Sequence, residues 1–194
     1  MISNMSAKTS TPIHPVLSNR RSPRSFDATA NISNETLVAM LEAARWAPSA
    51  NNFQPWRFHV GVRGDEVFNS ILSTLVPFNQ SWAIRASALV LVSIVNQNED
   101  GTPRTLSGFD AGLAVSQLTF EAHSRDLVAH QMAGFDAEKA IETFVLPSEI
   151  APIVVIAIGT QGPAEQLEGT LLERETAPRQ RKELSEIVLA GLPN

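Results

Sequence analysis

The sequence contains no cysteine among its 194 residues. This absence excludes disulfide bonds, thiolate metal sites and a cysteine nucleophile, and it fits the cytoplasmic location that we expect. Long apolar runs are lacking as well. The first fourteen residues hold no apolar stretch of the kind found in signal peptides, and no segment approaches the ~20 apolar residues of a membrane span. We therefore expect neither a signal peptide nor a membrane-spanning segment.

Positive charge is in deficit, with 15 basic against 20 acidic residues and a net charge of −5. This balance has the wrong sign for a general binder of nucleic acid or anionic membranes. The basic residues are nevertheless concentrated near the two ends of the chain, in two windows made of Arg20, Arg21 and Arg24, and of Arg174, Arg179, Arg181 and Lys182. Each window alone is typical of a solvated basic turn. Together they favour a small anionic ligand, because the planar guanidinium forms paired hydrogen bonds with phosphate oxygens.

The composition is that of a globular protein, with 43% hydrophobic and 18% charged residues. A chain of this length suits one domain, and it holds no internal repeat, linker or low-complexity stretch. We expect a single domain over residues 1–194, with residues 1–12 as a flexible tail.

Hydrophobic spacing predicts an alternation of helices and strands without strict βαβ order. Helices are expected around residues 14–20, from the N-cap Ser33 to near Pro48, over 65–75 and 106–125, and after the N-cap Asp136. Strands are expected over 56–62, 88–95 and 153–158, and the second of these is apolar enough to lie in the centre of a sheet. This pattern favours an α+β fold, with a layered sheet flanked by helices.

The helix expected over residues 106–125 is apolar or small nearly all the way round. Such a helix must be buried on all sides. In a chain of this size, we expect it to be a core helix shared with a second protomer.

Three other kinds of site find little support. The stretch Gly159-Thr-Gln-Gly162 follows a strand but lacks the third glycine of a dinucleotide fingerprint, so we interpret it as a turn. The four histidines show no metal-ligand spacing, no metal site is expected, and we expect these side chains at the surface or just behind a site. Ser49 stands in no nucleophile-elbow motif.

The stretch RWAPSANNFQPWRF, residues 45–58, ends a helix at a proline and then places small and amide side chains between aromatics. Asn52 and Gln54 suit a flat ligand with hydrogen-bonding atoms along one edge. Pro48 and Pro55 restrict the path of the loop, because each fixes its own φ and disfavours helix in the residue before it. Trp46, Trp56 and Phe58 are expected to pack in the core.

Five motifs occur in order: RRSPRSF, LEAARWAPSANNFQPWRF, DAGLAVSQLTFEA, GFDAEK and APRQRKEL. In this order they resemble the flavin-dependent nitroreductase family, and the resemblance spans roughly residues 20–188. It implies the nitroreductase-like layered fold, with a central mixed, mostly antiparallel sheet and an intertwined homodimer that binds FMN at the subunit interface.

The resemblance also implies which residues bind the cofactor. The two arginine windows would hold the phosphate and ribityl chain, the proline-flanked loop would line the flavin, partly from the partner subunit, and two further segments would meet the ring edges. The residues are Arg20, Arg21, Ser22, Arg24, Pro48, Ser49, Ala50, Asn52, Gln54, Asn79, Gln131, Ala133, Gly134, Arg179 and Arg181. Some family members have a lysine where this chain has Trp82, and the loop before His130 lacks the Gly-Leu-Gly of many relatives.

The activity implied is reduction of nitroaromatics, quinones or related small electron acceptors by NADH or NADPH in a ping-pong cycle, with no catalytic side chain. Three alternatives stay open at this stage. The chain could be a family variant that acts on enals, pteridines or flavin itself, a protein that stores or senses flavin without turnover, or a regulatory domain for a phosphorylated metabolite. Arg24 is our candidate for the positive group beside flavin N1, since Trp82 replaces the lysine.

Overall fold

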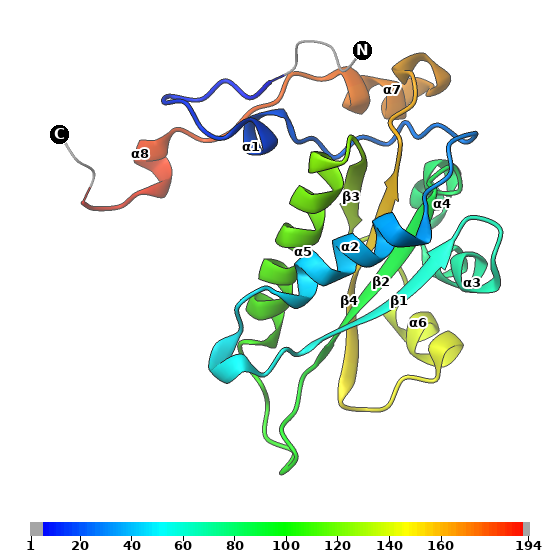
Figure 1. Ribbon diagram of the computed structural model, residues 1–194, viewed down its shortest axis with the longest axis vertical. Helices are drawn as coiled ribbons and strands as arrows, with labels where there is room; N and C mark the ends of the chain where they lie inside the picture. The colour runs from blue at the N-terminus through cyan, green and yellow to red at the C-terminus, as the bar shows by residue number, and fades with distance from the viewer. Residues whose placement is uncertain (1–5, 192–194) are drawn as a thin grey trace.

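The computed structural model describes residues 6–191, which form a four-stranded sheet with helices on both faces (Figure 1). Its α-helices are α1 (Pro15–Asn19), α2 (Asn34–Arg45), α3 (Glu66–Thr74), α4 (Pro77–Ala83), α5 (Ser107–Ser124), α6 (Ala137–Phe144), α7 (Gly169–Thr176) and α8 (Leu184–Ile187). Its strands are β1 (Trp56–Val62), β2 (Ala88–Val95), β3 (Val128–Met132) and β4 (Ile150–Gly159). Short 3₁₀ helices cover Ala50–Asn52 and Ala164–Gln166.

The sheet has the strand order β1-β2-β4-β3, and each neighbouring pair is antiparallel. Val90 of the central strand β2 lies opposite Val60 of β1 on one side and Ile156 of β4 on the other. The expected α+β fold, with a mostly antiparallel sheet flanked by helices, is confirmed. The strands β1 and β3 form the two edges of this sheet.

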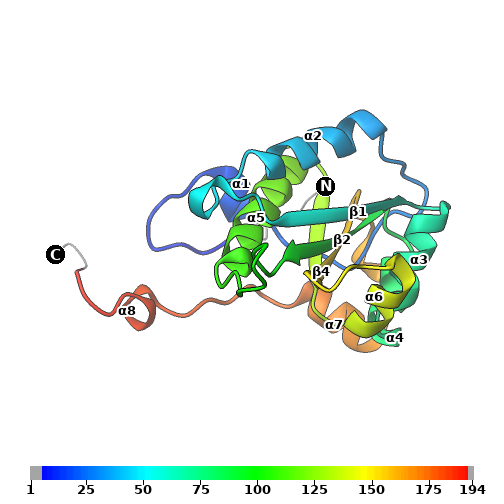
Figure 2. The same cartoon turned by 90° about the horizontal axis from the view of Figure 1, so that it is seen from below.

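Successive residues of β2 face opposite layers, as the pleat of a strand requires. Val90 and Val92 pack in the cluster that contains residues of α2 and α5, whereas Leu89 and Leu91 pack in the cluster that contains residues of α3, α4 and α6. Figure 2 shows the two helical layers on either side of the sheet. A continuous apolar strand is thus explained by burial on both faces.

Side-chain caps define where several helices begin. Ser33 Oγ accepts from the Thr36 N–H at 3.1 Å, and Asp136 Oδ1 accepts from the Lys139 N–H at 3.0 Å. These two caps were predicted from sequence. Asp65 serves α3 in the same way, with Oδ1 2.6 Å from the Phe68 nitrogen. Each contact satisfies a backbone donor that the first turn leaves without a helical partner.

Four α-helices or strands were not predicted from the sequence, namely α4, β3, α7 and α8. Each is short, and β3 carries His130 and Gln131 in its middle, so its apolar alternation is interrupted. α4 begins with Pro77 and holds only 7 residues, too few for an apolar face to repeat.

Trp46 is not in the core, and this expectation was wrong. Its side chain is 72% exposed, whereas Trp56 is buried and Phe58 is partly buried. Trp46 is the C-cap residue of α2, where its indole N–H donates to Glu42 Oε1 at 2.9 Å and Arg45 lies over its ring. A helix end directs this residue away from the sheet.

The segments near the two ends of the described chain lie at the same side of the sheet, and the C-terminal one extends away from it (Figures 1 and 2). The Ala7 N–H donates to Ser18 O at 2.8 Å, so this part of the expected tail folds back on α1, while residues 1–5 lie outside the described residues. Beyond α7, the segment with α8 extends from the sheet and exposes Ile187 and Leu189. None of the helices described is both long and apolar enough to cross a membrane.

Candidate functional site

The two arginine windows lie together, although about 150 residues separate them in sequence. Arg179 Nη1 donates to Ser18 O at 2.6 Å, and Arg21 Nη2 donates to Glu175 O at 2.8 Å. Burial lowers the pKa of the Arg179 guanidinium, and the charges of Arg20, Arg181 and Arg21 lower it further. Mutual repulsion of this kind requires that the guanidiniums approach one another closely.

Arg20 lies within this group of arginines. Burial first, and then the charge of Arg181, lower the pKa of Arg20, while its Nη1 donates to Ser22 Oγ at 3.1 Å. An anion placed among these side chains would relieve the repulsion. The structure therefore brings Arg20, Arg21, Ser22, Arg179 and Arg181 into one site that suits a phosphate group. We call these five residues the arginine cluster.

Arg24 stands at the edge of the arginine cluster and is held by a buried carboxylate. Its backbone N–H donates to Glu175 Oε2 at 2.7 Å, and Glu175 is only 6% exposed. Burial and the charge of Arg174 lower the pKa of Arg24, and the Glu175 carboxylate opposes them. The Arg24 Nε is buried without a hydrogen-bond partner among residues 6–191. A buried donor of this kind is what a ligand oxygen would satisfy.

His130 supports the arginine-bearing turn from below. Its Nδ1 lies 3.0 Å from Pro23 O, and its ring centroid lies 4.7 Å from that of Trp82, which stacks on Phe26 in turn. Burial, followed by the charge of Arg24, lowers the pKa of His130 to about 4, so the ring is neutral near pH 7 and its Nδ1 carries the donated hydrogen. Trp82 is 1% exposed, so this residue belongs to the core beneath the site.

Asn79 and Gly134, which the resemblance places at different edges of the flavin ring, contact each other in this structure. Asn79 Nδ2 donates to Gly134 O at 2.9 Å, and a Cβ added to Gly134 would lie 2.6 Å from that same nitrogen. A larger residue at position 134 would therefore push the Asn79 amide out of this position. Ala133 follows β3 directly, but Gln131 lies within β3 rather than in a loop, and its Nε2 donates to Thr119 Oγ1 of α5 at 2.6 Å.

The loop Ser49–Gln54, here called the amide loop, has an unusual backbone. Asn51, Asn52 and Gln54 have φ values of 50°, 56° and 50°, in the left-handed region that residues other than glycine rarely adopt. Each such residue costs about 1–2 kcal/mol relative to right-handed backbone, with asparagine at the lower end. Strain of this kind persists where surrounding contacts enforce it, and it is concentrated at functional sites.

Hydrogen bonds inside the amide loop enforce this conformation. Ser49 Oγ accepts from the Gln54 N–H at 3.0 Å, and Gln54 Nε2 donates to Asn52 O at 3.0 Å. Arg57 Nη1 donates to Gln54 O at 3.1 Å. Pro48 directly precedes the loop, and a proline at this position prevents α2 from continuing into the loop.

The amide loop and the arginine cluster do not meet within one protomer. The loop touches the start of α5, through the Ala50 N–H and Asp110, whereas α1 and the arginine-bearing turn lie near the other end of this helix (Figure 1). A helix of 18 residues is about 27 Å long. The two halves of the sequence-predicted site are therefore at opposite ends of α5.

Sequence reasoning missed two residues that shape these halves, namely Asp110 and Glu175. His130 was expected at the surface or just behind a site; it is 9% exposed and packs behind the arginine-bearing turn. Asp110 belongs to the motif DAGLAVSQLTFEA, but no role was assigned to it. Glu175 lies between basic residues, and only those were considered as ligand-binding groups. Among residues 6–191, no group of three histidine, aspartate or glutamate side chains could hold a metal ion.

The comparisons with known proteins agree on one family. The profile described as "Nitroreductase family" matches residues 17–75. A solved structure described as an oxidoreductase containing FMN is 33% identical, covers 99% of this chain and 98% of its own, and superposes with a TM-score of 0.91. The CLA biosynthesis enone reductase of Lactiplantibacillus plantarum is 31% identical over 74% of this chain and 83% of its own length. A putative NAD(P)H nitroreductase of Bacillus subtilis (strain 168), YdgI, is 28% identical over 74% of this chain and 86% of its own. The chain therefore belongs to the nitroreductase family.

Proposed function

We propose that this protein is an FMN-dependent oxidoreductase that uses NADH or NADPH to reduce nitroaromatics, quinones or related small acceptors. The observation that carries this proposal is the convergence of Arg20, Arg21 and Arg179 from the two ends of the chain. FMN carries a phosphate at the end of a flexible ribityl chain, and guanidiniums are well suited to phosphate oxygens. FMN is the cofactor, and NAD(P)H is the electron donor.

When bound, FMN supplies the redox chemistry, accepting hydride from NAD(P)H at N5 and passing the electrons to the second substrate in a ping-pong cycle. The side chains of this protein bind and orient. The arginine cluster would hold the phosphate, Arg24 would supply positive charge and its unpartnered Nε donor to the flavin, and Asn79 would meet a ring edge. No side chain has to act as a general acid or base. Positive charge next to the flavin favours its reduced, anionic form.

The separation of the two halves supports an intertwined homodimer. In one protomer the amide loop and the arginine cluster lie near opposite ends of α5, whose 18 residues span about 27 Å. A second copy placed antiparallel against α5 would bring its own amide loop to the first copy's arginines. Leu106 and Phe109, at the start of α5, are 54% and 67% exposed and would be covered by this partner. The site is thus complete only in the dimer.

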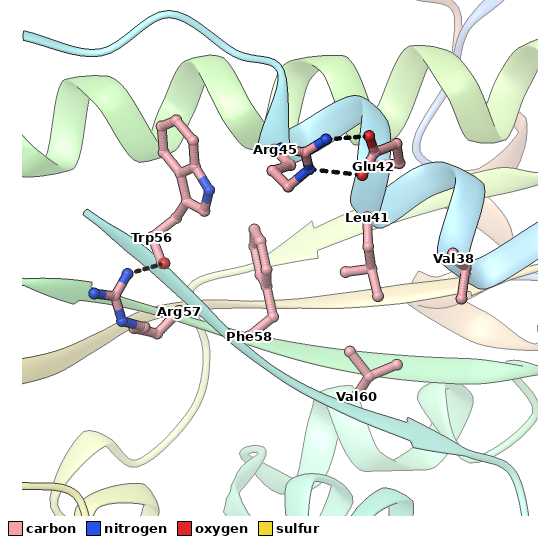
Figure 3. Close-up of a pocket in the computed structure, with 8 residues that line it drawn as sticks. All are labelled: Val38, Leu41, Glu42, Arg45, Trp56, Arg57, Phe58 and Val60. Carbon is pink, nitrogen blue, oxygen red and sulfur yellow. Dashed lines mark hydrogen bonds and ion pairs between the residues drawn. The ribbon is translucent and has the colours of Figure 1, made fainter. Parts of the chain in front are cut away.

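The C-terminal segment and the groove beside β1 fit the same assembly. Figure 3 shows the groove, which has a volume of about 460 Å³. Apolar residues of α2 and β1 line it, together with the charged Glu42, Arg45 and Arg57. The groove lies along β1, which is an edge strand of the sheet and pairs with another strand on one side only. Ile187 and Leu189, 59% and 93% exposed on the projecting segment, are the apolar residues that the partner would insert there.

The similarity to an enone reductase favours a second group of acceptors, α,β-unsaturated carbonyl compounds. These should be included beside nitroaromatics and quinones in the substrate panel. We further propose that residues 1–194 form one domain and that the protein acts in the cytoplasm, as the lack of cysteine suggests.

A visible spectrum of the freshly purified protein tests cofactor binding. We expect the yellow absorption of bound FMN, and rapid anaerobic bleaching on addition of NADPH or NADH. A colourless protein that does not bind added FMN would overturn the proposal. A yellow protein that neither nucleotide bleaches would instead be a flavin carrier or sensor.

A further inference from the structure

Asp110 is a buried carboxylate to which the mechanism above gives no task. It lies in the first turn of α5 and is 3% exposed. Both carboxylate oxygens face one donor, the Ala50 N–H, at 3.3 and 3.2 Å. Peptide dipoles at the start of a helix favour negative charge, so this position tolerates a buried anion.

The contact with Asp110 joins residues much farther apart in sequence than the other side-chain hydrogen bonds of the amide loop do. The bonds of Ser49, Asn52 and Gln54 join residues at most five positions apart, so they fix the shape of the loop but not its place. The Ala50–Asp110 contact joins residues 60 positions apart. Among the loop's hydrogen bonds in the described part of the chain, it is the one that ties the loop to α5. A cation–π contact of Arg104 with Phe53, 4.2 Å from guanidinium carbon to ring centroid, flanks it.

The amide loop needs such an anchor because three of its residues are left-handed. Strained backbone persists only where several contacts hold it, so the internal hydrogen bonds and a contact to the rest of the fold act together. Asp110 holds the loop at Ala50, directly before Asn51, the first of the three strained residues. The cavity beside this contact, about 180 Å³ in volume, leaves room for the loop to shift if the carboxylate is removed.

We propose that Asp110 is a positioning residue for flavin binding, whose carboxylate holds the amide loop where it meets the flavin of the partner subunit. This inference rests on the proposed function, since it takes the bound flavin as given. Asp110 itself does not touch the cofactor. It acts through the Ala50 N–H, and it links the start of the dimer-forming helix α5 to the flavin-lining loop.

The test compares Asp110→Ala, Asp110→Asn and Asp65→Ala as full-length proteins. Asp65 provides a matched control, because it also binds backbone N–H groups, those of Phe68 and Val62, but it does so beside α3, away from the amide loop. The measurements are the dissociation constant for FMN, the visible spectrum of the bound flavin, and the melting temperature. We expect Asp110→Ala to weaken FMN binding about tenfold or more and to alter the flavin spectrum.

Asparagine keeps an acceptor oxygen of the same size, so Asp110→Asn should restore most of the affinity and the spectrum. Asp65→Ala should lower the melting temperature and leave both flavin measurements unchanged. If Asp110→Ala binds FMN within twofold of the wild type with the same spectrum, the proposal is wrong. It is equally wrong if Asp65→Ala weakens FMN binding as much as Asp110→Ala does.

A second variant covers the case in which Asp110→Ala does not fold. Ala50→Pro removes the N–H that donates to the Asp110 carboxylate. Ser49, with φ −145° and ψ 156°, already has the extended backbone that a following proline requires. It should lose FMN affinity to a similar extent, and unchanged affinity would contradict the proposal. If the wild type binds no FMN at all, the proposed function fails; if only the variants behave unexpectedly, this inference alone fails.

Discussion

Arg179 and Ser18, 161 positions apart in sequence, are joined by a hydrogen bond of 2.6 Å from the guanidinium to the carbonyl oxygen. This contact fastens the segment after α7 to the end of α1, next to the turn that carries Arg20 and Arg21. It turns two separate basic windows into one site.

Replacing Arg179 with alanine should weaken FMN binding through the phosphate. We expect about a tenfold loss of affinity, because one charge-assisted hydrogen bond of the phosphate is removed. Riboflavin, which lacks the phosphate, should bind wild type and variant equally. Arg125→Ala, which removes a surface ion pair with Glu121, should change neither affinity. Equal losses for FMN and riboflavin would place Arg179 elsewhere than at the phosphate.

Arg24→Gln should make the bound flavin harder to reduce. Removing positive charge beside the ring destabilises the anionic reduced form, and we expect the midpoint potential to fall by about 30–60 mV, the equivalent of ~1.4–3 kcal/mol for two electrons. Spectroelectrochemistry of the holoprotein measures this shift. An unchanged potential would exclude Arg24 as the positive group beside the flavin.

His130 should make the stability of the protein depend on pH. Burial lowers the pKa of His130 to about 4, below the ordinary value of about 6.5, so between these values the unfolded chain binds more protons than the folded one. The contribution is therefore present above pH 6.5 and is lost as the pH falls toward 4, by up to about 3 kcal/mol. Urea unfolding measured at several pH values in this range should show that the free energy of unfolding depends less steeply on pH in His130→Gln than in the wild type. Identical slopes in the two proteins would contradict the assignment.

Gln54 offers a direct measure of the strain in the amide loop. At φ 50° a glycine is unstrained and an alanine is not, so Gln54→Gly should be more stable than Gln54→Ala by about 1 kcal/mol. Both variants lack the amide side chain, so their difference reports the backbone alone. The same pair at Gln80, inside α4, should show the opposite sign, because glycine is disfavoured in a helix. Denaturant unfolding measures all four variants.

Leu189→Asp should yield a monomer. An aspartate loses the apolar contacts that Leu189 would make with Val38, Leu41 and Phe58 in the groove beside β1, so the partner's C-terminal segment would be released. Light scattering should report half the wild-type mass, together with loss of bound flavin. Val145→Asp, at a residue 85% exposed and far from the groove, should remain dimeric. A wild type that is monomeric yet holds FMN tightly would refute the dimer itself.

Local chemistry is where sequence reasoning about this protein succeeds. The strands β1 and β2 were predicted with the bounds that the structure has, and the caps Ser33 and Asp136 marked the starts of α2 and α6. The helix expected over residues 106–125 is α5, within one residue at each end. These features depend on neighbours within a turn or a strand, which the sequence shows directly.

Long-range contacts decide the rest. Trp46 lies in a stretch rich in aromatics, yet it is exposed, since the end of α2 directs it outward. The resemblance places Gln131 with Ala133 and Gly134 in a segment beside the flavin ring, but pairing with β4 makes Gln131 part of a strand. His130 carries no sequence signal, and only the packing of Trp82 and the turn at Pro23 gives it a buried, neutral state.

The sequence alone determined which chemical groups this protein has: two arginine windows, an amide loop between prolines, and no thiol. Tertiary structure decided that the two windows meet and that the amide loop stands at the opposite end of α5. The physical reason is that hydrophobic spacing specifies how each segment folds locally, whereas the meeting of distant segments depends on the packing of whole layers against the sheet. The sign of a charge can be read along the chain, but whether it repels its neighbours depends on distances in space.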